Sequence, residues 1–280
     1  MSDDVLDSAN GVRSEQYIHG YSTEMQRFHS QRTAAAEAAF FLPHLRPGMA
    51  VLDCGCGPGS ITIDMAEVVT PGSVIGIDLA QAQIEHARTL ATARGVANVS
   101  FEVGDLYHLR FPDRSFDAAF AHNVLEHLRD PLSALVEMRR VLRPGGVVGI
   151  LDDDWGAYVW EPATPLLKQG IDLFLKVAEQ HGANLFYARH QKRLLREAGF
   201  VRIEGHAMAR CYGSPERLGL FVEAAVRQFQ DAAFVRTVRE RGWADQETLD
   251  AVIGAVRAWG ADPDAYRAIL CPAALGWVPE

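Results

Sequence analysis

The chain has 280 residues, of which 48% are hydrophobic and 22% charged, and these near-average values argue against wholesale disorder. Its formal net charge of −9 at pH 7 argues against a nucleic acid partner, because phosphate recognition needs a clustered cationic surface. The N-terminus lacks signal-peptide features, no apolar run could cross a bilayer, and four cysteines are too few for a disulfide scaffold. We therefore expect a cytoplasmic protein with no membrane or nucleic acid partner.

The N-terminal region, residues 1–45, is predicted to be an arm followed by a lid helix. Residues 1–20 are polar and irregular, and Thr23 with Gln26 forms a possible capping box for a helix. A helical stripe of apolar residues then follows at Met25, Phe28, Ala35, Ala36, Ala39 and Phe40. Pro43 and the turn at 46–48 end this pattern.

From Met49 onward, short apolar runs alternate with amphipathic helical patterns. The runs typical of strands are 49–54, 74–78, 99–103, 116–121 and 147–151. Helical patterns lie between them at 60–69, 80–94 and 131–142. This alternation predicts an α/β protein with a parallel sheet covered by helices on both faces.

After Asp154 the alternation ends. We expect helices over 162–181, 189–198 and 215–260, and strands over 200–212 and 268–277. No flexible linker separates these segments, so we interpret the chain as one Rossmann-like core with a discontinuous helical cap. The core would comprise 46–154, 191–212 and 266–280. The cap would comprise the insertions 155–190 and 213–265.

A glycine-rich loop lies between the first strand and the first helix of the core. It reads Asp53-Cys54-Gly55-Cys56-Gly57-Pro58-Gly59. Glycines allow the backbone to turn sharply and to approach a ligand, and the following helix presents free N–H groups there. Taken alone, the loop is a weak signal, because a tight strand-to-helix turn is the alternative interpretation.

Acidic residues follow the next two strands in the same way. A carboxylate at Asp78 could accept two hydrogen bonds from a ribose diol, and one at Asp105 could accept from an adenine amino group. Each could alternatively cap a helix or form a turn. Together with Asp53, they predict a site for an adenosine-type ligand that carries no phosphate.

These motifs resemble those of the class I S-adenosylmethionine-dependent methyltransferases. Besides the glycine-rich loop and Asp78, the resemblance rests on 104–106 (Gly-Asp-Leu), 123–128 (Asn-Val-Leu-Glu-His-Leu) and 142–146 (Leu-Arg-Pro-Gly-Gly). It covers residues 49–151 in the expected order. The resemblance implies a seven-stranded, mostly parallel sheet whose last strand, 268–277, runs antiparallel. It also implies a methyltransferase that uses S-adenosyl-L-methionine.

The resemblance also implies the cofactor contacts. The glycine-rich loop would approach the methionine part, Asp78 would hold the ribose, and the backbone near His122 and Asn123 would close over the sulfonium. Tyr21 resembles the aromatic residues that cover the cofactor in related small-molecule enzymes. The full set of implied cofactor-binding residues is Tyr21, Asp53, Gly55, Gly57, Gly59, Asp78, Leu79, Asp105, Leu106, His122 and Asn123.

Two rival cofactors fit the sequence less well. A nicotinamide enzyme would favour G-x-G-x-x-G, but that register here gives Gly55, Gly57 and Ser60. A P-loop would need Gly-Lys-Ser or Gly-Lys-Thr, which the sequence lacks. We also expect no metal, because the Cys54 and Cys56 pair has no partner ligands spaced for zinc.

The acceptor is predicted to be a small molecule, methylated at oxygen, nitrogen or carbon. The Asn/Asp-Pro-Pro-Tyr signature of many nucleic acid and protein methyltransferases is absent, and residues 155–160 are rich in aromatic side chains. We therefore favour an aromatic or otherwise apolar metabolite. A protein or nucleic acid methyltransferase, or a regulatory module that binds the cofactor without catalysis, remains an alternative.

Three residues are candidates for a catalytic role. Tyr21 and His19 would lie in the flap over the cofactor, and Asp153 ends the fifth strand, where the transferable methyl group should point. The run of carboxylates at 152–154 could orient an acceptor, bind Mg²⁺ or simply cap a helix. The protein is expected to be a monomer or a homodimer.

Overall fold

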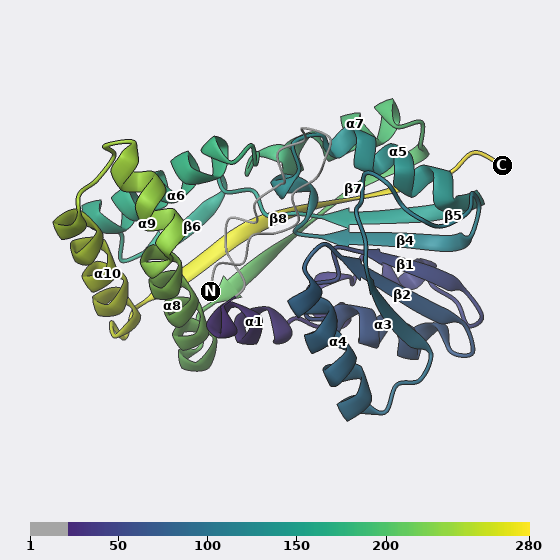
Figure 1. Cartoon of the computed structure of the whole chain (residues 1–280), viewed down its shortest axis with the longest axis horizontal. Helices are drawn as coiled ribbons and strands as arrows, with labels where there is room; N and C mark the ends of the chain where they lie inside the picture. Colours follow the sequence, from purple (N-terminus) through teal and green to yellow (C-terminus); the bar gives the residue numbers. More distant parts are fainter. Residues whose placement is uncertain (1–21) are drawn as a thin grey trace.

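The computed structural model describes residues 22–280. In it, the alternating strands and helices of the sequence form a single twisted sheet with helices packed against it (Figure 1). Its strands are β1 (Ala50–Cys54), β2 (Ser73–Asp78), β3 (Val99–Val103), β4 (Phe116–His122), β5 (Leu142–Leu151), β6 (Tyr158–Glu161), β7 (Val201–Tyr212) and β8 (Tyr266–Trp277). The order is β3-β2-β1-β4-β5-β8-β6, and β7 pairs with β8 outside this path. The mostly parallel α/β sheet predicted from the sequence is confirmed.

The five strands β1 to β5 are parallel, so their carboxyl ends meet at one edge of the sheet. Cys54, the last residue of β1, pairs with Ile77 on one side and Ala121 on the other. The segments that follow these strands therefore lie next to one another. This edge is where ligands bind in open parallel sheets.

The last strand, β8, runs antiparallel between β5 and β7, as the resemblance implied. Its second half pairs with β5 from Ala273 to Trp277, and its first half pairs with β6 from Tyr266 to Ile269. The sequence did not predict β6, which makes the sheet eight-stranded. Four residues at a sheet edge are too few to show a period in the sequence.

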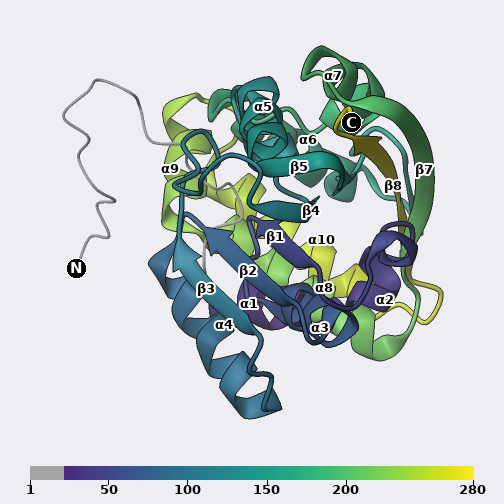
Figure 2. The same ribbon diagram turned by 90° about the vertical axis from the view of Figure 1, so that its right-hand side faces the viewer.

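Helices cover both faces of the core strands (Figure 2). One face carries α2 (Ala34–Glu37), α3 (Ser60–Val69) and α4 (Gln81–Arg94), and the other carries α5 (Pro131–Val141) and α7 (Gln191–Glu197). Three short 3₁₀ turns lie between these elements in the chain. They are η1 (Leu42–His44) before β1, η2 (Leu125–His127) before α5 and η3 (Tyr187–His190) before α7. Buried apolar side chains fill both interfaces, which explains the uniformly apolar strands.

The remaining helices gather at one end of the molecule, on the left of Figure 1. They are α6 (Pro165–Gln180), α8 (Pro215–Gln230), α9 (Ala232–Glu240) and α10 (Gln246–Gly260), and they share a separate hydrophobic core. Asp231 and Asp245 act as N-caps, so the single helix expected over 215–260 is three helices. Within residues 22–280, every helix falls short of the length and apolar character that a membrane-spanning segment needs.

The N-terminal helix also differs from the prediction. Ser22, not Thr23, is the N-cap of α1 (Thr23–Ser30), and its side chain accepts a hydrogen bond from the Met25 N–H. The helical stripe breaks after Ser30, because the Thr33 side chain caps α2 by accepting from the Ala36 N–H. The break places Arg32 in a loop that faces the sheet edge.

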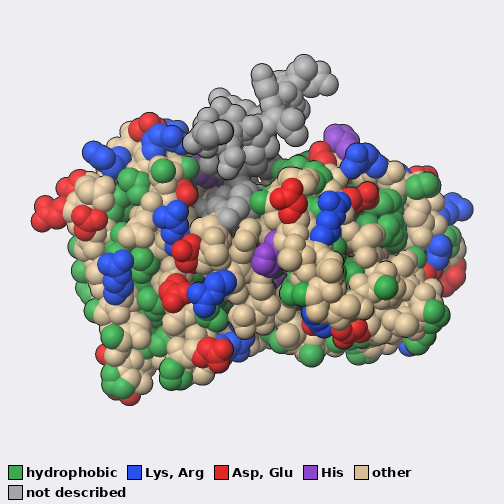
Figure 3. All heavy atoms as spheres, turned by 60° about the horizontal axis from the view of Figure 1, so that its bottom comes forward, with side chains coloured by type: hydrophobic (Ala, Val, Ile, Leu, Met, Phe, Trp, Pro, Cys, Tyr) green, Lys and Arg blue, Asp and Glu red, His purple; other side chains and the backbone are tan. Residues whose placement is uncertain are grey.

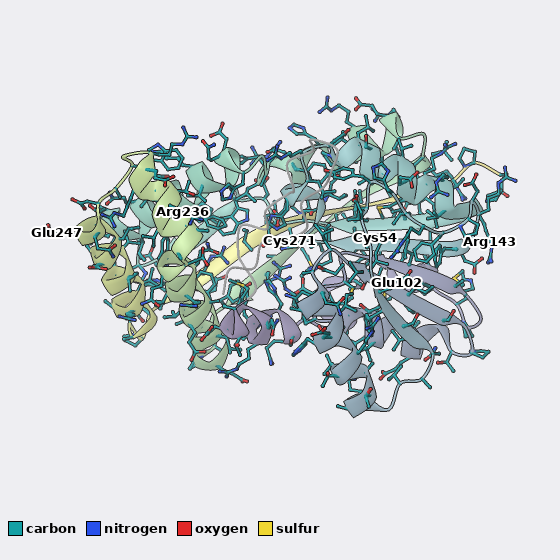
Figure 4. All side chains as sticks on the ribbon, viewed as in Figure 1. Cys54, Glu102, Arg143, Arg236, Glu247 and Cys271 are labelled. Atoms are coloured by element: carbon teal, nitrogen blue, oxygen red, sulfur yellow. The ribbon has the colours of Figure 1, made fainter. Side chains whose placement is uncertain are left out.

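A buried ionic cluster ties the N-terminal segment to the sheet. Arg210 of β7 is 3% exposed and binds both carboxylate oxygens of Asp153 through Nη1, at 2.6 and 2.8 Å. Its Nε and Nη2 donate to Glu37 of α2, the closest contact being 2.6 Å, and Nη2 lies 3.1 Å from His122 Nε2. Cys271, labelled on β8 in Figure 4, donates to Asp153 from its thiol at 3.2 Å. The cluster thereby connects α2, β4, β5, β7 and β8.

The carboxylates on either side of Asp153 act as further crosslinks. Asp152 accepts hydrogen bonds from the Val124 and Glu126 N–H groups and from the Gln191 side chain. Asp154 binds Arg189 through two hydrogen bonds, at 2.6 and 2.9 Å. All three carboxylates are buried. This run, for which the sequence left acceptor orientation, Mg²⁺ binding and helix capping open, therefore joins the end of β5 to its neighbours.

Removing the central cation should destabilise the fold strongly. In Arg210→Leu, Glu37 and Asp153 would remain buried without a counter-charge, which we expect to cost about 3–5 kcal/mol of unfolding free energy. Arg143→Leu, which breaks the half-exposed pair with Asp117, is the matched control and should cost less than about 1 kcal/mol. Urea denaturation followed by two optical probes measures both. Equal losses for the two variants would contradict this prediction.

The second prediction concerns pH. Burial raises the pKa of Asp152 from 3.8 to about 7, so between these values the folded state holds a proton that the unfolded state releases. The Asp152 contribution to stability should therefore fall as pH rises through this window. Asp152→Asn keeps an oxygen for the Val124 and Glu126 N–H groups but removes the titration.

The measurement is the unfolding free energy of the wild type minus that of Asp152→Asn. We expect this difference to decrease by on the order of 3–4 kcal/mol between about pH 4 and pH 8. Asp113→Asn, at an exposed side chain, is the control and should give a much flatter difference. A flat difference for Asp152→Asn would show that its carboxyl does not bind a proton on folding.

Candidate active site

The carboxyl ends of β1, β2 and β4 border a cavity of about 1150 Å³, including its mouth. The predicted residues that line it are Asp53, Gly55, Gly57, Asp78, Leu79, Asp105, Leu106, His122 and Asn123. Gly59 does not line it but begins α3, where a Cβ atom would lie 2.7 Å from the Ala87 Cβ. His19 and Tyr21 lie outside the described residues.

The glycine-rich loop has the open, left-handed geometry that the sequence predicts. Gly55 and Gly57 have φ angles of +74° and +52°, which side chains rarely adopt. A Cβ atom on Gly55 would clash with Val124, whereas one on Gly57 would meet nothing within 4 Å. The Gly57 position is therefore open on its side-chain face, and a ligand can approach the backbone there.

Two carboxylates, Asp53 buried and Asp78 half-buried, hold this loop in place. Asp78 accepts hydrogen bonds from the Gly57 N–H at 3.0 Å and from the Ala80 N–H at 2.9 Å. Asp53 accepts from the Thr62 hydroxyl, and burial raises the pKa of Asp53 to about 7. Burial also raises the pKa of Asp78. Each carboxylate oxygen of Asp78 has a second lone pair that a ligand hydroxyl could use.

Asn123 stands at the inner end of the cavity, directly after β4. Its φ of +52° is uncommon for a residue other than glycine, and its buried Oδ1 atom has no hydrogen-bond partner within residues 22–280. The Asn123 N–H donates to the Leu151 carbonyl, which fixes the backbone. An orphaned acceptor in a strained loop fits a position that a polar ligand completes.

His122 is buried beneath this loop rather than open to a ligand. Its Nε2 atom lies 3.1 Å from both Glu37 Oε2 and Arg210 Nη2. Burial lowers the pKa of His122 to about 4, so the ring is neutral at pH 7. The imidazole therefore belongs to the ionic cluster, and its backbone borders the cavity.

A second cavity of about 870 Å³, including its mouth, adjoins the first and extends toward the cap helices. The two share four wall residues, which are His29, Arg32, Asn123 and His127. Aromatic side chains form much of the second wall, namely Phe28, Trp155, Trp160, Phe174, Tyr212, Phe221 and Phe229. Both tryptophans come from the aromatic segment 155–160, which the sequence allows either to line the acceptor site or to belong to the core of the cap, and both also pack against that core.

Polar groups interrupt this aromatic wall at a few points. Asp153 lines the second cavity, but both of its oxygens bind Arg210. Burial alone would raise the pKa of Asp153, but the Arg210 cation outweighs this effect and the pKa is lowered to about 2. A carboxylate held in this way is a weak base. Glu126 is 1% exposed, and no described residue forms a hydrogen bond with its Oε2 atom. Burial raises the pKa of Glu126 well above the usual value.

Sequence reasoning missed several lining residues. Glu126 and His127 belong to the motif quoted after the fourth strand, so their position could have been predicted, although their roles could not. Arg32 and Arg267 carry no local signal, because a contact across the sheet leaves no periodic pattern.

Over the face drawn in Figure 3, acidic and basic side chains are interspersed rather than gathered by charge.

The sequence also matches known proteins. A family model of a methyltransferase domain matches residues 45–183. A sterol 24-C-methyltransferase of Gibberella zeae is 32% identical over 268 residues, covering 91% of this chain and 69% of that protein. An uncharacterized methyltransferase of Schizosaccharomyces pombe is 37% identical over 139 residues, covering 47% of this chain and 50% of that protein. The chain spans about half the length of several curated relatives that it matches.

Solved structures share the fold. The YcgJ protein of Bacillus subtilis aligns with a TM-score of 0.57 at 20% identity, over 87% of this chain and 98% of that one. The glycine-rich loop, the acidic strand ends and the antiparallel last strand are the features that the resemblance required. With the sequence matches, they show that the chain belongs to the class I S-adenosylmethionine-dependent methyltransferases.

Proposed function

We propose that this chain transfers the methyl group of S-adenosyl-L-methionine to an oxygen, nitrogen or carbon atom of a small apolar or aromatic molecule. The observation that carries the proposal is the shared wall between the two cavities, because an acceptor in the second cavity would lie beside a cofactor in the first. The relatives named as sterol and demethylmenaquinone methyltransferases support a small acceptor. A cavity walled by aromatic rings suits such a molecule.

In this proposal the first cavity holds the cofactor, which supplies an electrophilic methyl group when bound. The backbone at Gly55 and Gly57 approaches the methionine part, and Asp78 accepts hydrogen bonds from the ribose hydroxyls. Leu79 and Leu106 pack against the adenine, whose amino group donates to Asp105. The orphaned acceptor and the open glycine face fit this group without a further change in the loop.

The second cavity would contribute orientation and exclusion of water. Methyl transfer is an in-line displacement, so holding the acceptor at the correct distance supplies most of the catalysis. A base is needed only where the nucleophile must lose a proton. Because Asp153 and His122 have lowered pKa values and are bound to Arg210, we do not assign proton removal to them. A catalytic role for His19 or Tyr21 stays a prediction.

The test is incubation of the protein with S-adenosylmethionine carrying a labelled methyl group and a cell extract. The extract is separated into protein, nucleic acid and small-molecule fractions before and after reaction. We expect the label in organic-extractable small molecules, with release of S-adenosylhomocysteine. Label in protein or nucleic acid would support the alternative methyltransferase. Cofactor binding without transfer to any fraction would support a regulatory module.

Asp78→Ala should weaken binding of S-adenosylhomocysteine by at least about tenfold, because it leaves two ribose hydroxyls and the Gly57 N–H without an acceptor. Isothermal titration calorimetry measures this affinity. Glu102→Ala, on the adjacent strand but outside the cavity wall, is the matched control and should bind normally (Figure 4). Unchanged affinity for a folded Asp78→Ala variant would show that the ribose assignment is wrong.

Ala225→Phe should impair use of the acceptor without impairing binding of the cofactor. Ala225 lies on α8 and lines only the second cavity, so the added ring would fill acceptor space. We expect kcat/KM for the identified acceptor to fall by at least about tenfold, while the affinity for S-adenosylhomocysteine changes little. Ala258→Phe, at an exposed position of α10, is the control. Equal loss of cofactor binding in Ala225→Phe would contradict the assignment of the second cavity.

A further inference from the structure

Arg267 brings a positive charge into the aromatic wall of the second cavity. It lies in the first half of β8, directly opposite Trp160 of β6 and Tyr212 of β7. Four rings surround its guanidinium, with centroids 4.6 Å away for Phe221, 5.2 Å for Tyr212, 5.5 Å for Trp155 and 5.6 Å for Trp160. The side chain is buried and lines the cavity.

Within the part of the chain that the structure describes, this arginine has no hydrogen-bond acceptor. Among residues 22–280, no carboxylate forms an ion pair with it and no oxygen accepts a hydrogen bond from its guanidinium. Its buried Nε–H finds no partner among the described residues, and burial lowers the pKa of Arg267. Buried arginines are normally paired, since an unpaired buried cation is costly. The Arg267 guanidinium therefore lacks an anionic partner among the described residues.

The surrounding aromatic rings do not replace an anionic partner for Arg267. An aromatic face attracts a cation, but it leaves the in-plane N–H donors of the guanidinium without acceptors. These donors form a planar fork that matches a carboxylate with two parallel hydrogen bonds. The rings fix the plane of the guanidinium and exclude water, which strengthens such a pair.

The nearby charges also favour an anionic partner. Asp153 is the ionised carboxylate of the cavity wall, and both of its oxygens already bind Arg210. Burial raises the pKa of Glu126, because it disfavours the charged form of this carboxyl. Arg32, which also lines the cavity, forms no ion pair within residues 22–280. The wall consequently has two arginines without an ion pair, next to the position proposed for a cationic sulfonium.

We propose that the methyl acceptor carries a carboxylate group, and that Arg267 binds this carboxylate while the surrounding rings hold the apolar remainder. This inference rests on the proposed function, because it assigns the second cavity to the acceptor. It narrows the acceptor class from apolar molecules in general to small apolar or aromatic acids. Arg267 is thus a specificity-determining residue.

The test measures binding, so it does not require the natural acceptor. In the presence of S-adenosylhomocysteine, indole-3-acetate, cinnamate and 2-naphthoate are titrated calorimetrically against the three corresponding carboxamides. We expect the acids to bind at least about tenfold more tightly than the amides, since only they form a charge-assisted pair. A lack of preference, including failure of all three acids to bind, would overturn the proposal.

Variants then assign the preference to this side chain. Arg267→Gln should weaken acid binding by at least about tenfold and change amide binding by less than about threefold. Arg267→Lys should restore part of the preference, because it keeps the charge without the planar fork. Arg217→Gln is the matched control, since Arg217 also contacts the Tyr212 ring but is exposed and outside the cavity wall.

Two outcomes distinguish this inference from its premise. If Arg267→Gln lowers acid and amide binding equally, the arginine only maintains the shape of the wall and the inference fails. If all variants bind S-adenosylhomocysteine but prefer neither ligand class, the inference fails while the proposed function stands. If the wild type prefers acids but transfers no methyl group from S-adenosylmethionine to any fraction, the proposed function fails instead.

Discussion

Arg210 joins three parts of the chain that are far apart in sequence, since its guanidinium binds Glu37 of α2 and Asp153 at the end of β5. It reaches both because β7 lies beside β8, and β8 lies beside β5. A buried arginine between two carboxylates is tolerated only while all three groups stay in place. The position of the N-terminal segment against the sheet therefore depends on the C-terminal strands.

This constraint determines the geometry between the two cavities. One side of their shared wall is His29, near the end of α1, and Arg32 in the loop that follows, which the Glu37 contact anchors through α2. The other side is Asn123, whose strained backbone lies between β4 and the N–H groups that Asp152 binds. Buried carboxylates thus fix both sides of the point where cofactor and acceptor would meet. A reaction that relies on orientation needs this rigidity.

The sequence predicted the core strands closely, because apolar runs and turn residues are local signals. It did not predict the pairing of Glu37 with Arg210, since residues so distant in sequence share no periodic pattern. For the same reason, the carboxylate at Asp153 was predicted to face a ligand, although its oxygens both contact Arg210. The cofactor cavity was easier to predict than the acceptor cavity because its residues follow consecutive strands. The acceptor wall is assembled from separate helices and from β6 to β8.

Strand β8 belongs both to the core sheet, which the sequence predicted, and to the wall of the second cavity, which it did not. Its second half, from Ala273 to Trp277, completes the core sheet that the resemblance implied. Its first half extends beyond the core, between β6 and β7, and carries Arg267 into the aromatic wall. A strand that is shared in this way transmits the register of the core to the acceptor cavity, because a slip of one residue would turn Arg267 to the opposite face. If the second cavity binds the acceptor as proposed, the hydrogen-bond ladder that stabilises the fold also sets acceptor specificity.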